Sequence, residues 1–260
     1  MKFYAVVGTL FRSFVYIFLM LPLAIVVMTS FSDTNYVVFP PQGFTLKWFP
    51  EALGNADFFK SIKVSLLIGA VSTCISTVIG TMASLYFWKT SGRAKEWIET
   101  IFLSPVVVPT VVSAVAFLQF YSGIGSINTL AALILSYSII QVSYVIRTVS
   151  ASLYGMDASI EEAALVLGAT PLRTLFKVTL SMAKRGIIAG AVFAFVVAFD
   201  EAVIVMFLSD ARTITYPLRL YSYISENYTP MISAFSTVFI LISFLVIYFT
   251  EKFIGVGKMY

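Results

Sequence analysis

The sequence predicts an all-α integral membrane protein with about six transmembrane helices, and three observations lead to this fold class. Hydrophobic residues make up 59% of the 260 residues and charged residues only 12%, about half the charged share of a soluble domain. The mean hydropathy of +0.93 excludes an ordinary water-soluble fold. The apolar residues also gather into runs that are each close to the roughly 20 residues that a helix needs to cross a bilayer.

Six apolar runs are the candidate transmembrane helices. They cover residues 10–30, 62–87, 100–120, 128–147, 187–208 and 232–250. We expect residues 1–60 to form a first transmembrane helix with an extracytoplasmic segment, and residues 61–260 to form a domain of five helices. The first run is too long for the apolar core of a signal peptide and no A-x-A site follows it, so we expect it to stay in the mature protein.

Lysine and arginine residues predict the orientation of the chain. With the N-terminus in the cytoplasm, twelve basic residues fall on the cytoplasmic side and five on the outer side. This excess follows the positive-inside rule and places both termini in the cytoplasm. The same orientation makes residues 148–185 a long cytoplasmic loop. Because the membrane accounts for the distribution of the net charge of +4, no nucleic-acid partner is predicted.

The residue inventory excludes most kinds of catalytic or metal site. Histidine is absent and Cys74 is the only cysteine, so no zinc cluster, disulfide, haem site, Ser-His pair or Cys-His pair can form. The sequence also lacks the spacing of a phosphate-binding P-loop. We therefore expect no enzymatic activity, no metal and no cofactor bound by this chain. An intramembrane enzyme would have to take its nucleophile and base from Asp, Glu, Ser or Tyr.

The stretch SIEEAALVLGATPLRTLFKVTLS, residues 159–181, has the local chemistry of a helical hairpin. Ser159 begins the S-x-x-E spacing of a capping box at the start of a helix. Gly168 can end that helix in a left-handed conformation. Thr170 can then cap a second helix, which has Pro171 at its first position. We expect two short helices that meet at a sharp angle in the cytoplasmic loop.

The second of these predicted helices is amphipathic. Its apolar residues fall on one face and its basic residues on another: Leu172, Leu175, Phe176 and Leu180 against Arg173 and Lys177. A basic amphipathic helix can lie flat on the membrane surface as a simple connector. The residue pattern alone leaves that alternative open.

The same stretch resembles the EAA loop of bacterial ABC importer permeases. The pattern of that loop is E-A-A, three residues, G, nine residues and then I-x-L-P. The segment E-A-A at 162–164 is followed by three residues and Gly168, which matches the first half of the pattern. Nine residues later, Val178 stands in place of the isoleucine and Ser181 in place of the proline.

The resemblance covers nearly the whole chain. It implies a type I ABC importer permease fold, with a cytoplasmic coupling helix in an EAA loop at about 157–181. The segments SFSDTNY and GFTLKWF near the start, and AFDEAVIVMFLS in the fifth run, look like the polyamine (spermidine/putrescine) branch of these permeases. The residues that the resemblance assigns to ATPase coupling are Glu161, Glu162, Ala163, Ala164, Gly168, Ala169, Pro171 and Arg173.

The resemblance also implies the partners of the chain. These are a second permease subunit, which the family favours as a paralogue, two cytoplasmic ATPase subunits and a periplasmic or other extracytoplasmic binding protein, at a bacterial inner membrane. ATP and Mg²⁺ would be used by the ATPase and not by this chain. The missing P-loop agrees with this division, because a chain without it has to take its energy from a partner.

Two adjacent acids, Asp200 and Glu201, lie near the middle of the fifth run, where an acid costs on the order of 2.5–3.5 kcal/mol. Neighbours on a helix point about 100° apart. We therefore expect one acid to face the substrate pathway and the other to bind a neighbouring helix or free backbone groups at a break; a structural role for both is the alternative. Phe195, Phe199 and Tyr144 are candidate pathway residues, because rings and carboxylates together suit an organic ammonium ion.

The sequence therefore predicts the permease subunit of an ATP-driven, binding-protein-dependent importer for polyamines or related small organic cations. An opine, an aminoalkylphosphonate or an amino acid derivative stays open as the substrate, because related permeases carry all of these. A proton-coupled carrier is the alternative from another class of transporter. It would use Asp200 and Glu201 as its relay and would need no ATPase.

Overall fold

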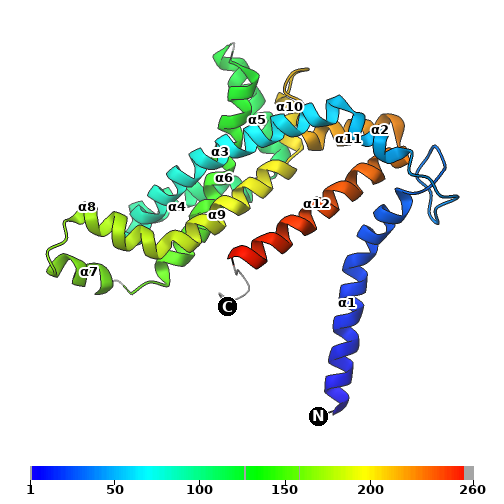
Figure 1. The fold of residues 1–260 in the computed structure, drawn as a ribbon. Helices are drawn as coiled ribbons and strands as arrows, with labels where there is room; N and C mark the ends of the chain where they lie inside the picture. The colour runs from blue at the N-terminus through cyan, green and yellow to red at the C-terminus, as the bar shows by residue number, and fades with distance from the viewer. Residues whose placement is uncertain (1, 126, 158, 255–260) are drawn as a thin grey trace. The chain divides into compact units, whose positions relative to one another are not determined.

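The structure is a computed structural model that describes residues 2–125, 127–157 and 159–254. Every regular element in these ranges is a helix. Figure 1 shows the order of the helices along the chain. The predicted all-α fold class is therefore confirmed for the described part of the chain.

The helices fall into two compact units. The first contains Met1–Phe58 and Leu220–Tyr260, and the second contains Phe59–Arg219. The division that we predict after residue 60 groups the chain differently, because it counts the C-terminal segment with the five-helix domain. It stays a prediction.

The first unit joins the two ends of the sequence. Its helices are α1 (Lys2–Thr29), α2 (Trp48–Gly54) and α12 (Pro230–Ile254). Thr29 Oγ1 donates to Ser233 Oγ at 3.0 Å, which links the end of α1 to the start of α12. Trp48 Nε1 donates to the Ser32 carbonyl at 2.8 Å and so holds the segment between α1 and α2 against α2.

The second unit contains both regions that the sequence singles out. Its helical elements follow in the order α3 (Ala56–Lys89), α4 (Arg93–Val107), α5 (Thr110–Ile124), α6 (Thr129–Tyr154), α7 (Ser159–Val166), α8 (Pro171–Thr174), the π-helical η1 (Leu175–Thr179), α9 (Leu180–Asp200), α10 (Val203–Leu208) and the start of α11 (Tyr216–Asn227). Both the predicted hairpin and the adjacent acids of the fifth run therefore belong to one unit.

Fewer helices qualify as straight spans than the six that the sequence predicts. Among the described residues, four helical stretches are long and apolar enough to cross a membrane: Val7–Thr29, Ala56–Lys89, Thr129–Tyr154 and Pro171–Asp200. The bent pair α4–α5 makes a fifth if it is counted as one span. The apolar stretch Pro230–Leu245 of α12 is shorter than these.

The apolar run over residues 100–120 is not one continuous helix, because two prolines break it. Helices α4 and α5 meet at 105°. Pro109 forces the residue before it into an extended conformation, which ends α4. Pro105 has no N–H and so leaves the Ile101 carbonyl without its helical donor. Ser104 Oγ donates to that carbonyl at 2.8 Å.

The predicted cytoplasmic loop, residues 148–185, is largely helical, and its place in the cytoplasm stays a prediction. Helix α6 continues to Tyr154, and one helical run extends over Pro171–Asp200 through the π-helical η1. The second short helix of the predicted hairpin is therefore continuous with the long helix that contains α9. The chain has no helix breaker here, since Ser181, which replaces the proline of the motif, lies inside the helix with its backbone N–H available.

Glycines let α6 pack closely against α3 and α9. A Cβ on Gly186 of α9 would lie 2.5 Å from the Cβ of Ser152 and 3.0 Å from the carbonyl oxygen of Thr148. A Cβ on Gly80 of α3 would lie 2.7 Å from the Cβ of Val145. Close backbone approach of this kind stabilises helix pairs in lipid, where no hydrophobic effect draws helices together.

Gly186→Ala is expected to destabilise the packing of α9 on α6. The new Cβ would overlap Ser152 and Thr148, and overpacking costs about 1–3 kcal/mol. The matched control is Gly123→Ala in α5, where a Cβ meets no heavy atom within 4 Å. Thermal unfolding of each purified variant in detergent measures the effect. Equal midpoints for the two variants would contradict the close approach at Gly186.

Candidate functional site

Helix α3 connects two polar regions at its opposite ends. Near its start, Ser65 Oγ accepts a hydrogen bond from the Tyr216 N–H at 2.8 Å. At its end, Lys89 Nζ donates to Glu161 Oε1 at 2.7 Å. The helix between Ser65 and Lys89 is about 36 Å long at roughly 1.5 Å per residue, which exceeds the roughly 30 Å of a hydrocarbon core. Glu161 and Tyr216 therefore lie at opposite ends of a helix that is long enough to cross a membrane.

Helix α7 begins at an aspartate cap and not at the predicted capping box. Asp157 Oδ1 accepts a hydrogen bond from the Ser159 N–H at 2.9 Å. The Asp157 carbonyl also accepts from the Ile160 N–H at 3.2 Å. Ser159 itself lies within the helix, so its side chain does not take the capping position. The hydrogen bond from Ser159 holds the pKa of Asp157 below its usual value.

The end of α7 is a Schellman motif. Gly168 has a φ of +87°, in the left-handed region. Its N–H donates to the Leu165 carbonyl at 3.0 Å. The Ala169 N–H donates to the Ala164 carbonyl at 3.1 Å, and these two bonds together define the motif. The left-handed turn predicted at Gly168 is confirmed.

A second cap starts α8 directly after this turn, as the sequence predicts. Thr170 Oγ1 accepts a hydrogen bond from the Arg173 N–H at 3.4 Å. Pro171 occupies the first helical position, where its missing N–H does no harm. Residues 159–174 thus form a rigid corner of two helices, the α7–α8 hairpin. Figure 1 shows this hairpin at the beginning of the long helix that continues into α9.

The α7–α8 hairpin and the residues next to it expose apolar side chains. The exposed fraction is at least 43% for Ile160, Leu165, Val166, Leu167, Leu172 and Phe176. Val166 and Leu167 are the most open, at 87% each. Glu162, Ala163 and Arg173 are exposed beside them. An apolar surface with a polar rim is typical of a site that another molecule covers.

Glu161 differs from Glu162 because it is bound within the chain. Its side chain is 17% exposed. Oε1 of Glu161 accepts hydrogen bonds from Lys89 Nζ at 2.7 Å and from Thr179 Oγ1 at 2.8 Å. Partial burial raises the pKa of Glu161, but these two hydrogen bonds and the charge of Lys89 outweigh it, so the pKa lies below its usual value. Glu161 is therefore ionised at neutral pH.

The fifth apolar run is broken at its two acids, and such a break is one of the two alternatives that the sequence offers for the second acid. Helix α9 ends at Asp200, Glu201 is extended, and α10 begins at Val203. Glu201 Oε1 accepts a hydrogen bond from the Val203 N–H at 2.6 Å. The Glu201 carbonyl accepts one from the Tyr137 hydroxyl at 2.7 Å. Glu201 thus satisfies a free backbone group at a break, which is the structural role expected for one of the two acids.

Asp200 has the opposite surroundings. Its side chain is exposed, and the described residues offer it no hydrogen bond or ion pair. It ends α9, where the helix carbonyls carry partial negative charge, so its own charge is not compensated. Other exposed residues recur along the same side of α9 at helical spacing: Arg185, Ala189, Val192, Phe193 and Val196. These residues and Asp200 form the exposed stripe of α9.

The structure separates the three aromatic residues that the sequence assigns to the pathway. Phe195 and Phe199 stack on each other with ring centres 6.1 Å apart. Phe199 lies about 100° around the helix axis from Asp200. Tyr144 instead meets Phe193 edge-on at 5.3 Å, and Phe193 belongs to the exposed stripe. Sequence reasoning did not single out Phe193, although its position two helical turns before Asp200 is a signal for it.

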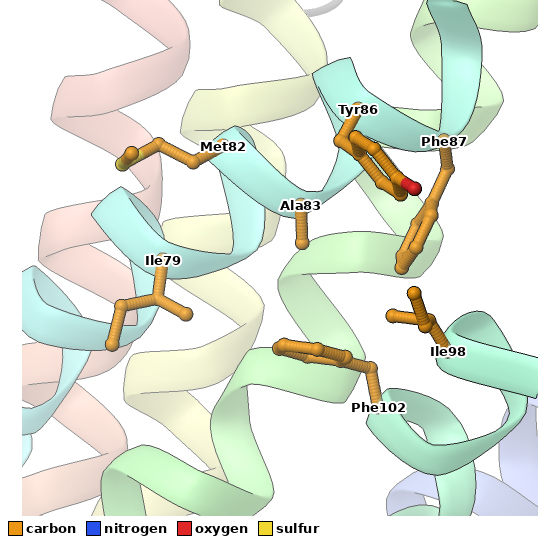
Figure 2. A pocket seen from close by; sticks show the side chains of 7 residues that line it. All are labelled: Ile79, Met82, Ala83, Tyr86, Phe87, Ile98 and Phe102. Atoms are coloured by element: carbon orange, nitrogen blue, oxygen red, sulfur yellow. The ribbon is translucent and has the colours of Figure 1, made fainter. Parts of the chain in front are cut away.

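Two apolar hollows adjoin each other along α3 and α4. Figure 2 shows the first, of about 330 Å³, lined by Ile79, Met82, Ala83, Tyr86, Phe87, Ile98 and Phe102. The second, of about 320 Å³, shares Ile79 and Phe102 and reaches α6. No charged side chain lines either hollow. Neither hollow can therefore neutralise a charged solute.

A comparison with protein families matches residues 76–254 to the binding-protein-dependent transport system inner membrane component. The chain belongs to this family. The matched range contains the α7–α8 hairpin and the exposed stripe of α9, so both candidate sites lie within the family domain. The chain is therefore the membrane permease component of an ABC importer.

Permease proteins of polyamine transport systems are similar in sequence over most of this chain. The spermidine/putrescine transport system permease protein PotC of Escherichia coli (strain K12) is 25% identical over 91% of this chain and 89% of its own length. PotC of Haemophilus influenzae is 25% identical over 93% of both chains. The putrescine transport system permease protein PotI of Escherichia coli (strain K12) is 28% identical over 85% of this chain and 80% of its own. The resemblance to the polyamine branch is confirmed as a similarity of sequence.

Solved structures share the fold. A bacterial ABC transporter involved in the import of the acidic polysaccharide alginate matches with a TM-score of 0.75 and 15% identity over 97% of this chain and 96% of its own. An amino acid ABC transporter matches with a TM-score of 0.59 and 17% identity over 78% of this chain and 98% of its own. Identities this low show the fold alone, and they confirm the predicted fold of an ABC importer permease.

Glu201→Ala is expected to lower the free energy of unfolding by about 1–3 kcal/mol, because the Val203 N–H loses its acceptor at the break. Glu201→Gln should keep most of the stability, since an amide oxygen can accept the same hydrogen bond. Thermal unfolding of the purified variants in detergent compares them. An equal loss in both would show that the charge matters and not the acceptor, and would contradict this structural role.

Proposed function

We propose that this chain is the permease subunit of an ATP-driven importer and that a separate ATPase subunit binds the α7–α8 hairpin. The observation that carries the proposal is the exposed apolar surface of the hairpin on a rigid, doubly capped frame. Such a surface is expected to be covered by a partner. The sequence itself has no P-loop for ATP, so the energy for transport has to come from that partner.

The hairpin is built to dock and to move as one body. Ala163 is exposed and small, which allows close approach of a partner. Gly168 fixes the angle between the two helices through its left-handed turn. Val166 and Leu167 supply apolar surface at the tip. A displacement of the hairpin passes directly into the membrane, because α8 is continuous with α9 in the helix Pro171–Asp200.

The proposed assembly combines these surfaces with the partners that the resemblance to ABC importer permeases implies. The hairpin end of α3 is cytoplasmic, together with both termini, and faces two ATPase subunits. A second permease subunit, proposed to be a paralogue, covers the exposed stripe of α9 and closes the pathway. An extracytoplasmic binding protein delivers the solute to the opposite face. The alginate transporter of similar fold has a structure in complex with a periplasmic protein that binds an alginate pentasaccharide, which supports the last partner.

The proposed solute is a polyamine or a related small organic cation. Asp200 is the acid of the fifth run that no backbone group or base compensates. A carboxylate in a medium of low dielectric attracts an ammonium group strongly. Phe193 lies on the same stripe and meets Tyr144, and such rings add cation–π attraction. The names of the relatives, which are polyamine permeases, support the same class of solute.

The alternatives have weaker support in the geometry. An opine, an aminoalkylphosphonate or an amino acid derivative carries an anionic group that needs a base. On the exposed stripe that base is Arg185, about 22 Å from Asp200 along the helix at roughly 1.5 Å per residue. A proton-coupled carrier would use both acids as a relay, but Glu201 is already engaged by the Val203 N–H.

Gly168→Val is expected to uncouple ATP hydrolysis from transport, because a β-branched residue is strongly disfavoured at a φ of +87°. Gly168→Asn is the matched control, since asparagine tolerates the left-handed region. The first measurement is copurification of the ATPase with each variant. The second is spermidine uptake per ATP hydrolysed, in liposomes that contain the assembled complex. Normal values for Gly168→Val would overturn the docking role of the hairpin.

Asp200→Asn is expected to reduce spermidine and putrescine uptake about tenfold, which corresponds to roughly 1.4 kcal/mol of lost attraction. The amide keeps the shape of the side chain and removes the charge. Glu201→Gln is the comparison, because it removes a charge one residue away and keeps the hydrogen bond at the break. Uptake per assembled complex separates transport from yield. Full uptake with Asp200→Asn would refute the proposed contact with a cation.

A further inference from the structure

Helix α7 is held only weakly by apolar packing. None of its side chains is buried. A hollow of about 560 Å³ opens beside its first turn, lined by residues of α6 and α9 such as Ser152, Met182 and Arg185. Most helical stability in proteins comes from packing of an amphipathic face, and α7 has no such buried face. Its position relative to the membrane helices therefore depends on a few polar contacts.

Glu161 provides these contacts through one atom. Oε1 accepts hydrogen bonds from Lys89 Nζ at 2.7 Å and from Thr179 Oγ1 at 2.8 Å. Lys89 is the last residue of α3, and Thr179 is the last residue of η1, directly before α9. The two donors lie 72 and 18 residues from Glu161 in the sequence. One carboxylate oxygen on α7 thus joins two different membrane helices.

Thr179 places one of these contacts at a distinctive point of the long helix. Residues Leu175–Thr179 form a π-helical segment, and such segments occur frequently at functional sites. Thr179 is fully buried, and its hydroxyl also lies 3.5 Å from the Thr174 carbonyl across the π turn. The contact from α7 therefore ends where the helix departs from regular α hydrogen bonding, whereas the contact with Lys89 ends at the terminus of α3.

We propose that Glu161 is the positioning residue that transmits movement of α7 to both α3 and α9. This inference rests on the proposed function, in which an ATPase moves the hairpin. Glu162 is exposed and available to the partner, so the two adjacent acids have separate roles, one toward the membrane helices and one toward the ATPase. Without the contacts of Glu161, α7 moves with the ATPase while α3 receives no displacement.

The test measures movement without any knowledge of the solute. The complex of both permease subunits and the ATPase is prepared with two spin labels, at Val78→Cys on α3 and Ile188→Cys on α9, in a Cys74→Ala background. Both positions are open in this chain, with exposed fractions of 61% and 62%, and Ile188 lies outside the exposed stripe. The distance between the labels is measured without nucleotide and with ATP trapped by vanadate.

The complex without further substitutions is expected to change its label distance when ATP is trapped. Glu161→Ala should reduce the fraction of complexes that change about tenfold, the scale of one hydrogen bond to a charged group, while the ATPase still copurifies. Thr179→Val, which removes one of the two donors at nearly constant shape, should give a smaller loss. Glu96→Gln, an exposed acid at the same end of the unit, is the matched control and should change nothing.

Charge reversal adds a rescue. The double variant Glu161→Lys with Lys89→Glu restores an ion pair with the charges exchanged, so we expect it to recover most of the distance change that Glu161→Lys alone loses. A merely structural requirement for glutamate at position 161 would not be rescued in this way. Failure of the rescue, with the ATPase still bound, would contradict transmission through the Lys89 contact.

The outcomes distinguish this inference from the proposed function. A full distance change in Glu161→Ala overturns transmission by Glu161 and leaves the docking of the hairpin intact. Loss of the ATPase from Glu161→Ala alone shows a docking role and also overturns transmission. No distance change in the complex without further substitutions, or no copurifying ATPase, overturns the proposed function itself.

Discussion

The need to satisfy backbone hydrogen bonds within the membrane is the constraint on which the rest of this structure depends. No water in the hydrocarbon core can bind an N–H or a carbonyl that a break sets free, so the protein must supply the partner. Ser104 binds the carbonyl freed by Pro105, and Glu201 binds the first N–H of α10. Glu201, one of the two adjacent acids, is thereby engaged in a hydrogen bond with the backbone. Asp200 alone is left with an uncommitted charge.

Features that depend on a few neighbouring residues could be predicted from the sequence. The turn at Gly168 and the cap at Thr170 are of this kind, because each is closed within one helical turn. The break at Pro109 is also local. The apolar run around it is nevertheless long enough to cross a membrane, and for that reason residues 100–120 are predicted as one transmembrane helix. The pair of Lys89 and Glu161 is different, since 72 residues separate its members and any of many bases could have met that acid. Only the folded chain, which brings α7 beside the end of α3, selects the partner.

The fold does not determine the charge of the solute. A transporter of the acidic polysaccharide alginate shares this fold with a TM-score of 0.75, while the named relatives by sequence are polyamine permeases. Solutes of opposite charge thus cross membranes in the same arrangement of helices, and function resides in a few side chains carried by that arrangement. The exposed stripe of α9 carries one acid, Asp200, and one base, Arg185, among apolar residues, and it is in side chains of this kind that such permeases can differ.

The π-helical η1 sets the rotational register of the helix that follows it. A turn closed by i→i+5 hydrogen bonds holds one residue more than an α-helical turn, and one residue corresponds to about 100° of rotation about the helix axis. The extra residue rotates the hairpin, which precedes Leu175, about the helix axis relative to α9. The directions in which Gly186 and Asp200 point are unchanged. A deletion or insertion of one residue within η1 would re-aim the hairpin and leave the packed face of α9 where it is.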